Sequence, residues 1–336
     1  MISVFGQNLS KEDLLKRIGD MSQIVGAAPI SYTDGRAKGT AAIEIKNGSG
    51  LRFVVMTDRG MDISYAEING TPFSFISKTG VVGPQHYDET DFLRSFTGGL
   101  LTTCGLTYMG AACVDEGKQL GLHGRISNIP AYDVSVNQDW QGEDYVVSVS
   151  GKVRESAMFG ENIVLKRTIT TKLGDNRIYI SDEVVNEGFE ETPLMILYHM
   201  NFGYPLVSEH TVLETNCTDK SPRNDIAEKG METSDEFCAP VHGYVEQCFY
   251  RNAVEKSFAS LINKETGLSA KIEFYGAQLP YLIQWKQMGE KDYVVGLEPG
   301  TWYPEGRAKA RETSNLQFIK PQETKRFDIV VSSEKQ

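Results

Sequence analysis

Strand-type segments follow one another through most of this chain, with no helical segment between them. The clearest ones alternate apolar and polar residues and cover 41–46, 51–56, 144–153, 162–171, 177–186, 257–263, 268–274, 281–286, 293–298 and 326–331. Short polar turns, such as Asn47-Gly48-Ser49-Gly50, separate neighbouring segments. Parallel strands would need crossover connections of about a dozen residues or more, usually helices. The pattern therefore predicts an all-β, mainly antiparallel fold, including a meander over 144–186.

The domain organisation predicted from this pattern is simple. No shift in composition marks a linker, and no repeat of fixed period is visible, so we expect residues 26–336 to form a single large β-sandwich. Residues 1–25 are expected to form an arm packed on that body. Within the arm, Ser10 and Asp13 resemble a capping box, which predicts a short N-terminal helix that Gly19 closes.

The least regular part of the chain is 215–243. It contains Pro222, Asn224, Gly230 and Pro240, which interrupt regular structure. We expect a long loop or a small insertion there.

Charge and composition narrow the partners of the protein. The 45 acidic and 34 basic residues give a formal net charge of −11, and no basic run is present, which disfavours nucleic acid. No apolar stretch approaches the roughly 18 residues needed to span a bilayer, and the first residues lack the features of a signal peptide. The five cysteines form no Cys-x-x-Cys pair, which favours reduced thiols over a zinc site. A cytoplasmic protein acting on a small molecule is expected, and its oligomeric state is left open.

Familiar catalytic signatures are missing from the sequence. It contains no phosphate-binding Gly-x-x-x-x-Gly-Lys-Ser/Thr loop, no Gly-x-Gly-x-x-Gly, no Gly-x-Ser-x-Gly and no His-Glu-x-x-His. Nucleotide hydrolysis, a dinucleotide cofactor, an α/β-hydrolase and a standard zinc protease are thereby disfavoured. Proton-transfer chemistry that needs no cofactor remains.

Two histidines and a glutamate are the candidates for such chemistry. His199 follows the apolar run 193–197, at the expected end of a strand, and Glu298 stands where the strand 293–298 ends. His123 lies between Gly121 and Gly124, which suggests a backbone that something approaches closely. Each residue alone is more typical of a satisfied core or solvated side chain. Together they supply a proton acceptor and a proton donor.

Arginines and aromatic residues add candidates for binding. Arg59 and Arg94 have the fixed fork of donors that suits hydroxyl groups. Trp302 and Tyr303 follow Glu298 closely and could stack on a sugar ring, although ordinary surface aromatics are an equal alternative.

Four strings around these residues carry a resemblance to a known family. They are Arg94 to Gly99, Leu122-His123-Gly124, His199-Met200-Asn201-Phe202-Gly203, and Leu297-Glu298 followed by Pro304-Glu305. In this order, the chain from about residue 25 onward resembles the galactose mutarotase-like (aldose 1-epimerase) superfamily. Asp58-Arg59-Gly60-Met61-Asp62 and His123-Gly124-Arg125-Ile126-Ser127-Asn128 look like a less studied bacterial branch of it. Asn201 stands where the family has a tyrosine.

The resemblance implies a β-supersandwich that interconverts the α and β anomers of an aldose. Glu298 would take the proton of the anomeric hydroxyl, and His199 would protonate the ring oxygen. The residues implied to bind substrate are His123, Arg94, Arg59, Arg125, Asn201 and Trp302. Neither a metal nor an organic cofactor is expected. A sugar-binding or sensing protein, or an isomerase of a modified sugar, are the alternatives on the same fold.

Overall fold

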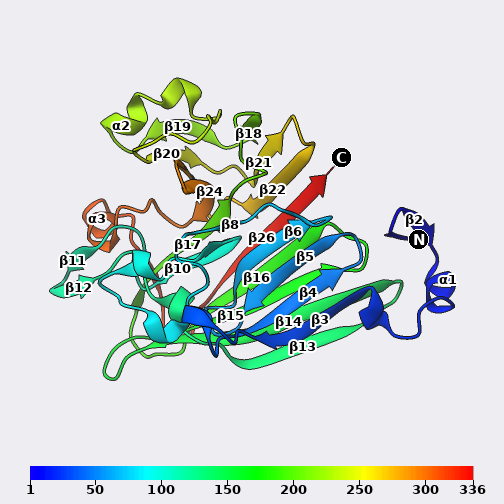
Figure 1. Cartoon of the computed structure of the whole chain (residues 1–336). Helices are drawn as coiled ribbons and strands as arrows, with labels where there is room; N and C mark the ends of the chain where they lie inside the picture. Colours follow the sequence, from blue (N-terminus) through cyan, green and yellow to red (C-terminus); the bar gives the residue numbers. More distant parts are fainter. Residues whose placement is uncertain (336) are drawn as a thin grey trace.

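Two large antiparallel sheets dominate the computed structural model, which describes residues 1–335 (Figure 1). One sheet has 12 strands and the other has eight. The predicted all-β architecture is confirmed, and the strand 177–186 has the bounds that its pattern predicted.

The larger sheet follows the order β19 (Thr218–Pro222), β20 (Gln247–Asn252), β23 (Tyr281–Gly289), β24 (Asp292–Gly300), β17 (Thr192–Phe202), β10 (Leu101–Leu106), β6 (Asp62–Ile68), β5 (Leu51–Met56), β4 (Ala41–Asn47) and β3 (Val25–Ser31). Two further strands pair with members of this path, β25 (Gln317–Ile319) with β17 and β7 (Thr71–Pro72) with β6. Strands distant in sequence therefore become neighbours at its centre, above all β10, β17 and β24.

The smaller sheet follows the order β13 (Tyr132–Gln141), β14 (Asp144–Ser156), β15 (Asn162–Lys172), β16 (Arg177–Asn186), β26 (Thr324–Lys335), β22 (Leu268–Tyr275), β21 (Lys256–Asn263) and β18 (Thr211–Thr215). The meander over β14, β15 and β16 is as predicted. The pattern had not predicted β13, because this edge strand is exposed along most of its length and lacks a clear apolar face.

Small elements surround the sheets. Three two-stranded sheets pair β1 (Ile2–Val4) with β2 (Gln7–Leu9), β8 (Phe75–Ile76) with β9 (Gly98–Gly99), and β11 (Cys113–Asp115) with β12 (Lys118–Leu120). The α-helices are α1 (Lys11–Leu15), α2 (Asp225–Glu228) and α3 (Arg307–Glu312). Within residues 1–335, no helix has the length and apolar character needed to cross a membrane.

The N-terminal helix is shorter than expected. Ser10 caps it as predicted, accepting a hydrogen bond from the backbone nitrogen of Asp13 at 3.0 Å. The helix ends at Leu15 instead of continuing to Gly19. Only Leu14 is buried on it, and a short helix with so little tertiary contact is marginal. The division into an arm over 1–25 and a body stays a prediction.

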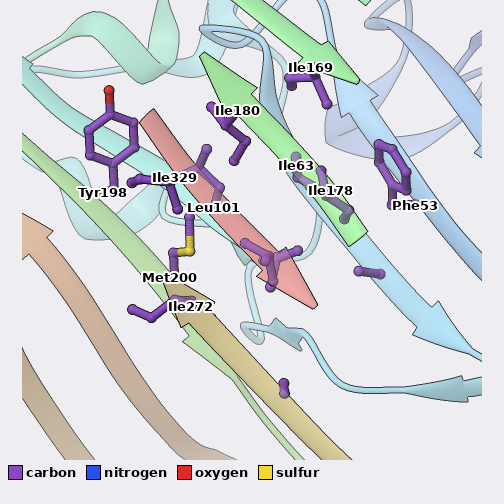
Figure 2. Packing of buried hydrophobic residues seen from close by; sticks show 14 of the residues in the cluster. Phe53, Ile63, Leu101, Ile169, Ile178, Ile180, Tyr198, Met200, Ile272 and Ile329 are labelled. Carbon is purple, nitrogen blue, oxygen red and sulfur yellow. The ribbon is translucent and has the colours of Figure 1, made fainter. Parts of the chain in front are cut away.

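The two sheets pack face to face around one apolar core (Figure 2). Phe53 and Ile63 of the larger sheet meet Ile169, Ile178 and Ile329 of the smaller one, all fully or almost fully buried. This contact buries only one face of each sheet, so the outer face of the larger sheet is free to carry a site.

The central strand β17 is buried on both faces. Tyr198 and Met200 point into the core between the sheets, whereas Leu197 belongs to a second apolar cluster on the outer face. Because side chains alternate along a strand, His199 and Asn201 share the outer face with Leu197. The segment around α3 covers this face in part, since Ala310 belongs to the second cluster.

A buried ion cluster joins the sheets directly behind this face. Arg167 has no exposed side-chain surface and lies 2.7 Å from a carboxylate oxygen of Asp182 and 2.9 Å from one of Asp62. Tyr198 donates its hydroxyl hydrogen to Asp182 at 2.7 Å, and Thr103 donates its backbone N–H to Asp62 at 2.9 Å. The cluster thereby links β15 and β16 to β6, β17 and β10.

Candidate active site

His199 and Glu298 are cross-strand neighbours in the larger sheet. Met200 of β17 lies opposite Leu297 of β24, and this antiparallel register places His199 opposite Glu298. The Nε2 of His199 is 3.2 Å from Oε1 of Glu298, and only 7% and 2% of the two side chains are exposed. Both strands continue beyond these residues, so the two side chains lie within strands and not at strand ends as expected.

His123 approaches His199 from the loop after β12, and the two ring centroids are 5.6 Å apart. Its backbone has φ +61°, a conformation that non-glycine residues rarely adopt, and its N–H donates to the carbonyl of Gly110 at 2.8 Å. The neighbouring glycines are approached closely by the chain itself. A Cβ at Gly121 would lie 2.1 Å from the carbonyl of Glu89, and one at Gly124 would lie 2.3 Å from a backbone oxygen.

Aromatic rings enclose His199 on the outer face. The ring of Trp285 in β23 is 5.3 Å away between centroids, and that of Phe96 is 5.4 Å away. Both meet the imidazole edge to face. These contacts hold the ring in one orientation and keep bulk water from most of its surface.

The histidines and the glutamate line a cavity of about 270 Å³. Small-ligand pockets commonly measure about 300–1,000 Å³, so this cavity suits a small molecule. Its lining comprises Phe92, Leu93, Phe96, Ala111, Leu122, His123, His199, Arg223, Glu246, Cys248, Ile283, Trp285, Glu298 and Pro304. The structure thus brings together the three residues that the sequence had singled out as an acid–base set.

Three polar or aromatic lining residues were missed in the sequence. Arg223 lies in the irregular stretch 215–243, between β19 and α2, where no motif marks it. Glu246 just precedes β20, and it accepts a hydrogen bond from the Nε1 of Trp285 at 2.7 Å. Trp285 had a signal that could have found it, since it falls in a predicted strand next to the one that carries Glu298.

Burial shifts the pKa values of the three central groups toward their neutral forms. The pKa of Glu298 is raised well above its ordinary value by desolvation and, to a lesser degree, by Glu246. Desolvation lowers the pKa of His199 well below its usual range, and His123 adds to this effect. The pKa of His123 is lowered to about 4, by burial and by the positive charge of Arg223. Both shifts favour the uncharged forms, a protonated Glu298 and a neutral His199.

Unpaired polar atoms gather at this place. The buried atoms without a hydrogen bond include Nδ1 of His123, Nδ1 of His199, Oε1 of Glu298, Oδ1 of Asn201 and Nε1 of Trp302. More than about 90% of buried polar groups in native proteins are paired. Of these residues, His123, His199 and Glu298 line the cavity, so their unpaired atoms are available to a ligand or to one another.

The three arginines expected to bind substrate do not line the cavity. Arg59 is buried, and its guanidinium donates to the carbonyls of Val82, Ser95 and Ser127 and to the side chains of Thr97 and Asn128. Arg94 is exposed and pairs with Asp91. Arg125 pairs with Glu89 at 2.7 Å. Folding commits Arg59 to loop carbonyls and pairs Arg94 and Arg125 with nearby carboxylates, and a role of these arginines in binding stays a prediction.

Asn201 and Trp302 also lie outside the lining. Asn201 is fully buried beside His199. Trp302 packs against Tyr281 and Tyr303, with ring centroids 5.2 Å and 4.7 Å away. The tryptophan that lines the cavity is Trp285, together with Phe92 and Phe96.

Among residues 1–335, no group of three or more histidine, cysteine, aspartate or glutamate side chains is arranged to hold a metal ion.

The fold is that of solved galactose mutarotase-like proteins. The chain itself belongs to a family described as a domain of unknown function (DUF4432), whose model matches residues 37–332. Comparison with curated proteins finds no match.

Solved structures show the same fold over nearly the whole chain. A "putative aldose 1-epimerase" from Klebsiella pneumoniae is 24% identical, with a TM-score of 0.87 over 97% of this chain and 86% of the other. A galactose mutarotase-like protein from Clostridium acetobutylicum is 17% identical, with a TM-score of 0.64 over 94% and 100%. A galactose 1-epimerase from Lactobacillus acidophilus is 13% identical, with a TM-score of 0.61 over 93% and 99%. At these identities the similarity concerns the fold.

Proposed function

We propose that this protein is an aldose 1-epimerase that interconverts the anomers of a small sugar. The observation that carries the proposal is the contact of 3.2 Å between Nε2 of His199 and Oε1 of Glu298, both buried and both lining one cavity. A histidine and a carboxylate held this close can exchange a proton with each other and with a bound hydroxyl group. The galactose 1-epimerase among the similar structures supports the same reaction class.

The proton count of the pair suits mutarotation, which neither adds nor removes a proton. Ring opening starts with the proton on His199 and Glu298 ionised. Glu298 then takes the proton of the anomeric hydroxyl, Nε2 of His199 gives its proton to the ring oxygen, the bond between C1 and the ring oxygen breaks, and C1 becomes a carbonyl. Rotation about C1–C2 and the reverse transfers close the ring on the other face.

The resting state of the pair matches the middle of this cycle. After ring opening, Glu298 is protonated and His199 is neutral, which are the forms that burial favours in the empty site. The site is therefore preorganised for the open-chain sugar. For a ring to open, the proton must first pass from Glu298 to His199, and the 3.2 Å contact provides the path.

Other lining residues are suited to hold the sugar. We infer that His123, Arg223 and Glu246 hydrogen-bond the remaining hydroxyl groups, since they offer donors and acceptors around the cavity. Trp285 and Phe96 present apolar surface to the C–H faces of a sugar ring. Such contacts position the anomeric carbon against the catalytic pair.

Anomer exchange is measured directly by polarimetry or NMR on freshly dissolved sugars. The native protein is expected to accelerate exchange for at least one aldose. Glu298→Gln and His199→Asn should each lower the rate by about 10²–10⁴-fold, the usual contribution of a general acid or base. Their folding should be unchanged.

The chain offers a matched control pair on its surface. His210 and Glu265 lie 3.6 Å apart but are about half exposed or more, so His210→Asn and Glu265→Gln should leave the rate unaltered. A native rate in either site variant would remove that residue from the mechanism. Sugar binding without accelerated exchange would favour a sensing protein, and formation of a different sugar would favour another isomerase.

A further inference from the structure

Asn201 lies beside His199, and one of its two polar side-chain atoms is hydrogen-bonded while the other is not. The two residues are two positions apart on β17, so they project from the same face of the sheet. The Nδ2 of Asn201 donates a hydrogen bond to the backbone carbonyl of His199 at 2.9 Å. This bond fixes the orientation of the amide, because only the nitrogen can donate. The Oδ1 is left buried, as an acceptor without a conventional partner.

His199 has the complementary requirement. Its Nε2 faces Glu298, and its Nδ1 is buried without a conventional partner. A neutral imidazole carries its proton on one nitrogen and a lone pair on the other. The Asn201 side chain raises the pKa of His199, opposing the effects of burial and of His123. Oδ1 of Asn201 and Nδ1 of His199 are thus two buried unpaired atoms on one face of the strand, and the first can accept the hydrogen that the second can donate.

We propose that Asn201 is a positioning residue whose Oδ1 accepts the Nδ1–H of His199 and thereby keeps Nε2 as the nitrogen that exchanges protons. In this tautomer the lone pair of Nε2 faces the protonated carboxyl group of Glu298. When the proton passes to Nε2, the same Oδ1 stabilises the imidazolium ion. The catalytic part of this inference rests on the proposed function, whereas the tautomer does not.

An amide serves this purpose differently from a carboxylate. A carboxylate at this position would attract the proton to His199 permanently, because a buried negative charge favours the imidazolium form. A neutral acceptor selects the tautomer and still lets the proton return to Glu298. The titratable and charged groups around the ring that share in this balance are Glu298, His123, Arg223, Glu246, Cys104 and Cys248.

The tautomer can be measured without any substrate. The protein has five histidines, so uniform ¹⁵N-histidine labelling gives a simple two-bond ¹H–¹⁵N spectrum, in which His199→Asn identifies the signals of His199. The native protein is expected to show His199 as the Nδ1–H tautomer at pH 7. Asn201→Leu should convert it to Nε2–H or to a mixture, and Asn201→Asp should show an imidazolium ion.

Activity provides the second measurement. Asn201→Leu is expected to lower kcat at neutral pH by about tenfold to hundredfold, with a smaller change in KM, because a hydrogen bond to the charged imidazolium is lost. Asn201→Asp should move the pH–rate profile toward higher pH. The matched control is Asn137→Asp on the exposed strand β13, which adds the same charge and should leave both the profile and the His199 signals unchanged.

The outcomes separate this inference from the proposed function. A native His199 in the Nε2–H form, or an Asn201→Leu protein with unaltered His199 signals, would overturn the positioning role. If no sugar shows accelerated exchange but the signals change as expected, the tautomer is supported and the catalytic reading fails. Should Asn201→Leu not fold, Asn201→Asp, which is nearly isosteric, carries the same test.

Discussion

Two clusters of ionisable groups lie on opposite faces of the larger sheet, and they differ in how completely their buried polar atoms are hydrogen-bonded. On the core side, the charged groups around Arg167 are densely hydrogen-bonded, with five donor contacts from that guanidinium to Asp182, Asp62 and the carbonyl of Gly60. On the outer side, His199 and Glu298 retain unpaired buried atoms. Tyr198 belongs to the first cluster and His199, the next residue, belongs to the second.

The difference shows how a strand buried on both faces can carry a stabilising network on one face and reactive groups on the other. A satisfied buried network rigidifies the strands that it joins. An unsatisfied one costs stability, because each unpaired buried group retains its desolvation penalty, and it persists where a ligand completes it. The core-side cluster thus joins the strands of the two sheets, and the outer cluster lines the cavity.

The largest change in the free energy of unfolding is expected for the hydrogen-bonded cluster around Arg167. Arg167→Met would leave Asp62 and Asp182 buried without their cation, and breaking a buried pair in this way costs about 3–5 kcal/mol. Urea denaturation should show that loss in the free energy of unfolding. A change below about 1 kcal/mol, the usual value of an exposed pair, would show that the cluster does not hold the sheets together.

A substitution in the outer cluster, which contains His199 and Glu298, should change the stability in the opposite direction. Glu298→Leu removes a buried carboxyl group whose Oε1 has no hydrogen bond, so we expect the protein to gain about 1–3 kcal/mol of stability while anomer exchange is lost. The raised pKa of Glu298 means that the native protein loses stability as pH rises from about 4.5 toward that raised value. The gain in the variant should therefore be larger at pH 8 than at pH 4. A destabilised variant at both pH values would contradict the contrast.

Two arginines sharpen the comparison. Arg223→Gln should raise KM by about tenfold or more, the effect of losing a charged hydrogen-bond donor, with little change in stability, because Arg223 lines the cavity and is partly exposed. Arg59→Gln should lower the stability with little change in KM, since Arg59 donates hydrogen bonds to loop carbonyls. Steady-state exchange rates and thermal unfolding of both variants measure the contrast. Equal KM values in the native protein and Arg223→Gln would remove Arg223 from the binding site.

A last effect concerns how the stability of the protein changes with pH in acid. The pKa of His123 is lowered to about 4, so the stability that its neutral form contributes is present above the unfolded value near 6.5 and is lost as pH falls toward 4. His123→Asn should reduce this loss by up to about 1.4 kcal/mol per pH unit in that window. Urea denaturation between pH 4.5 and 7 tests it. His242→Asn, at an exposed histidine, is the control, and an unchanged slope in His123→Asn would contradict the lowered pKa.

Much of the fold could be predicted because alternation is a local property. Strands such as 51–56 and 177–186 were found within a residue or two, since one face of each meets the core. The edge strand β13 was missed because exposure removes that alternation. The extent of α1 was overestimated because its length depends on tertiary contact that the capping box does not report.

The site was predicted in part for similar reasons. His123, His199 and Glu298 could be found because each stands out from its own surroundings and because the strings around them resemble a known family. The arginine that lines the cavity, Arg223, could not be found in this way. The chain has several arginines beside glycines or polar turns. Only the tertiary structure shows that Arg59 donates its hydrogen bonds to loop carbonyls, whereas Arg223 lines the cavity.

The sequence by itself determined the antiparallel all-β class and the chemical types available for catalysis, because alternation and residue identity are written along the chain. The tertiary structure decided which of those residues meet. The register of β17 against β24 places His199 and Glu298 3.2 Å apart, although they are distant in sequence. Burial on the outer face of the sheet then raises the pKa of Glu298 and lowers that of His199. Neither the pairing nor the desolvation is a local property, and both arise only when the strands are assembled.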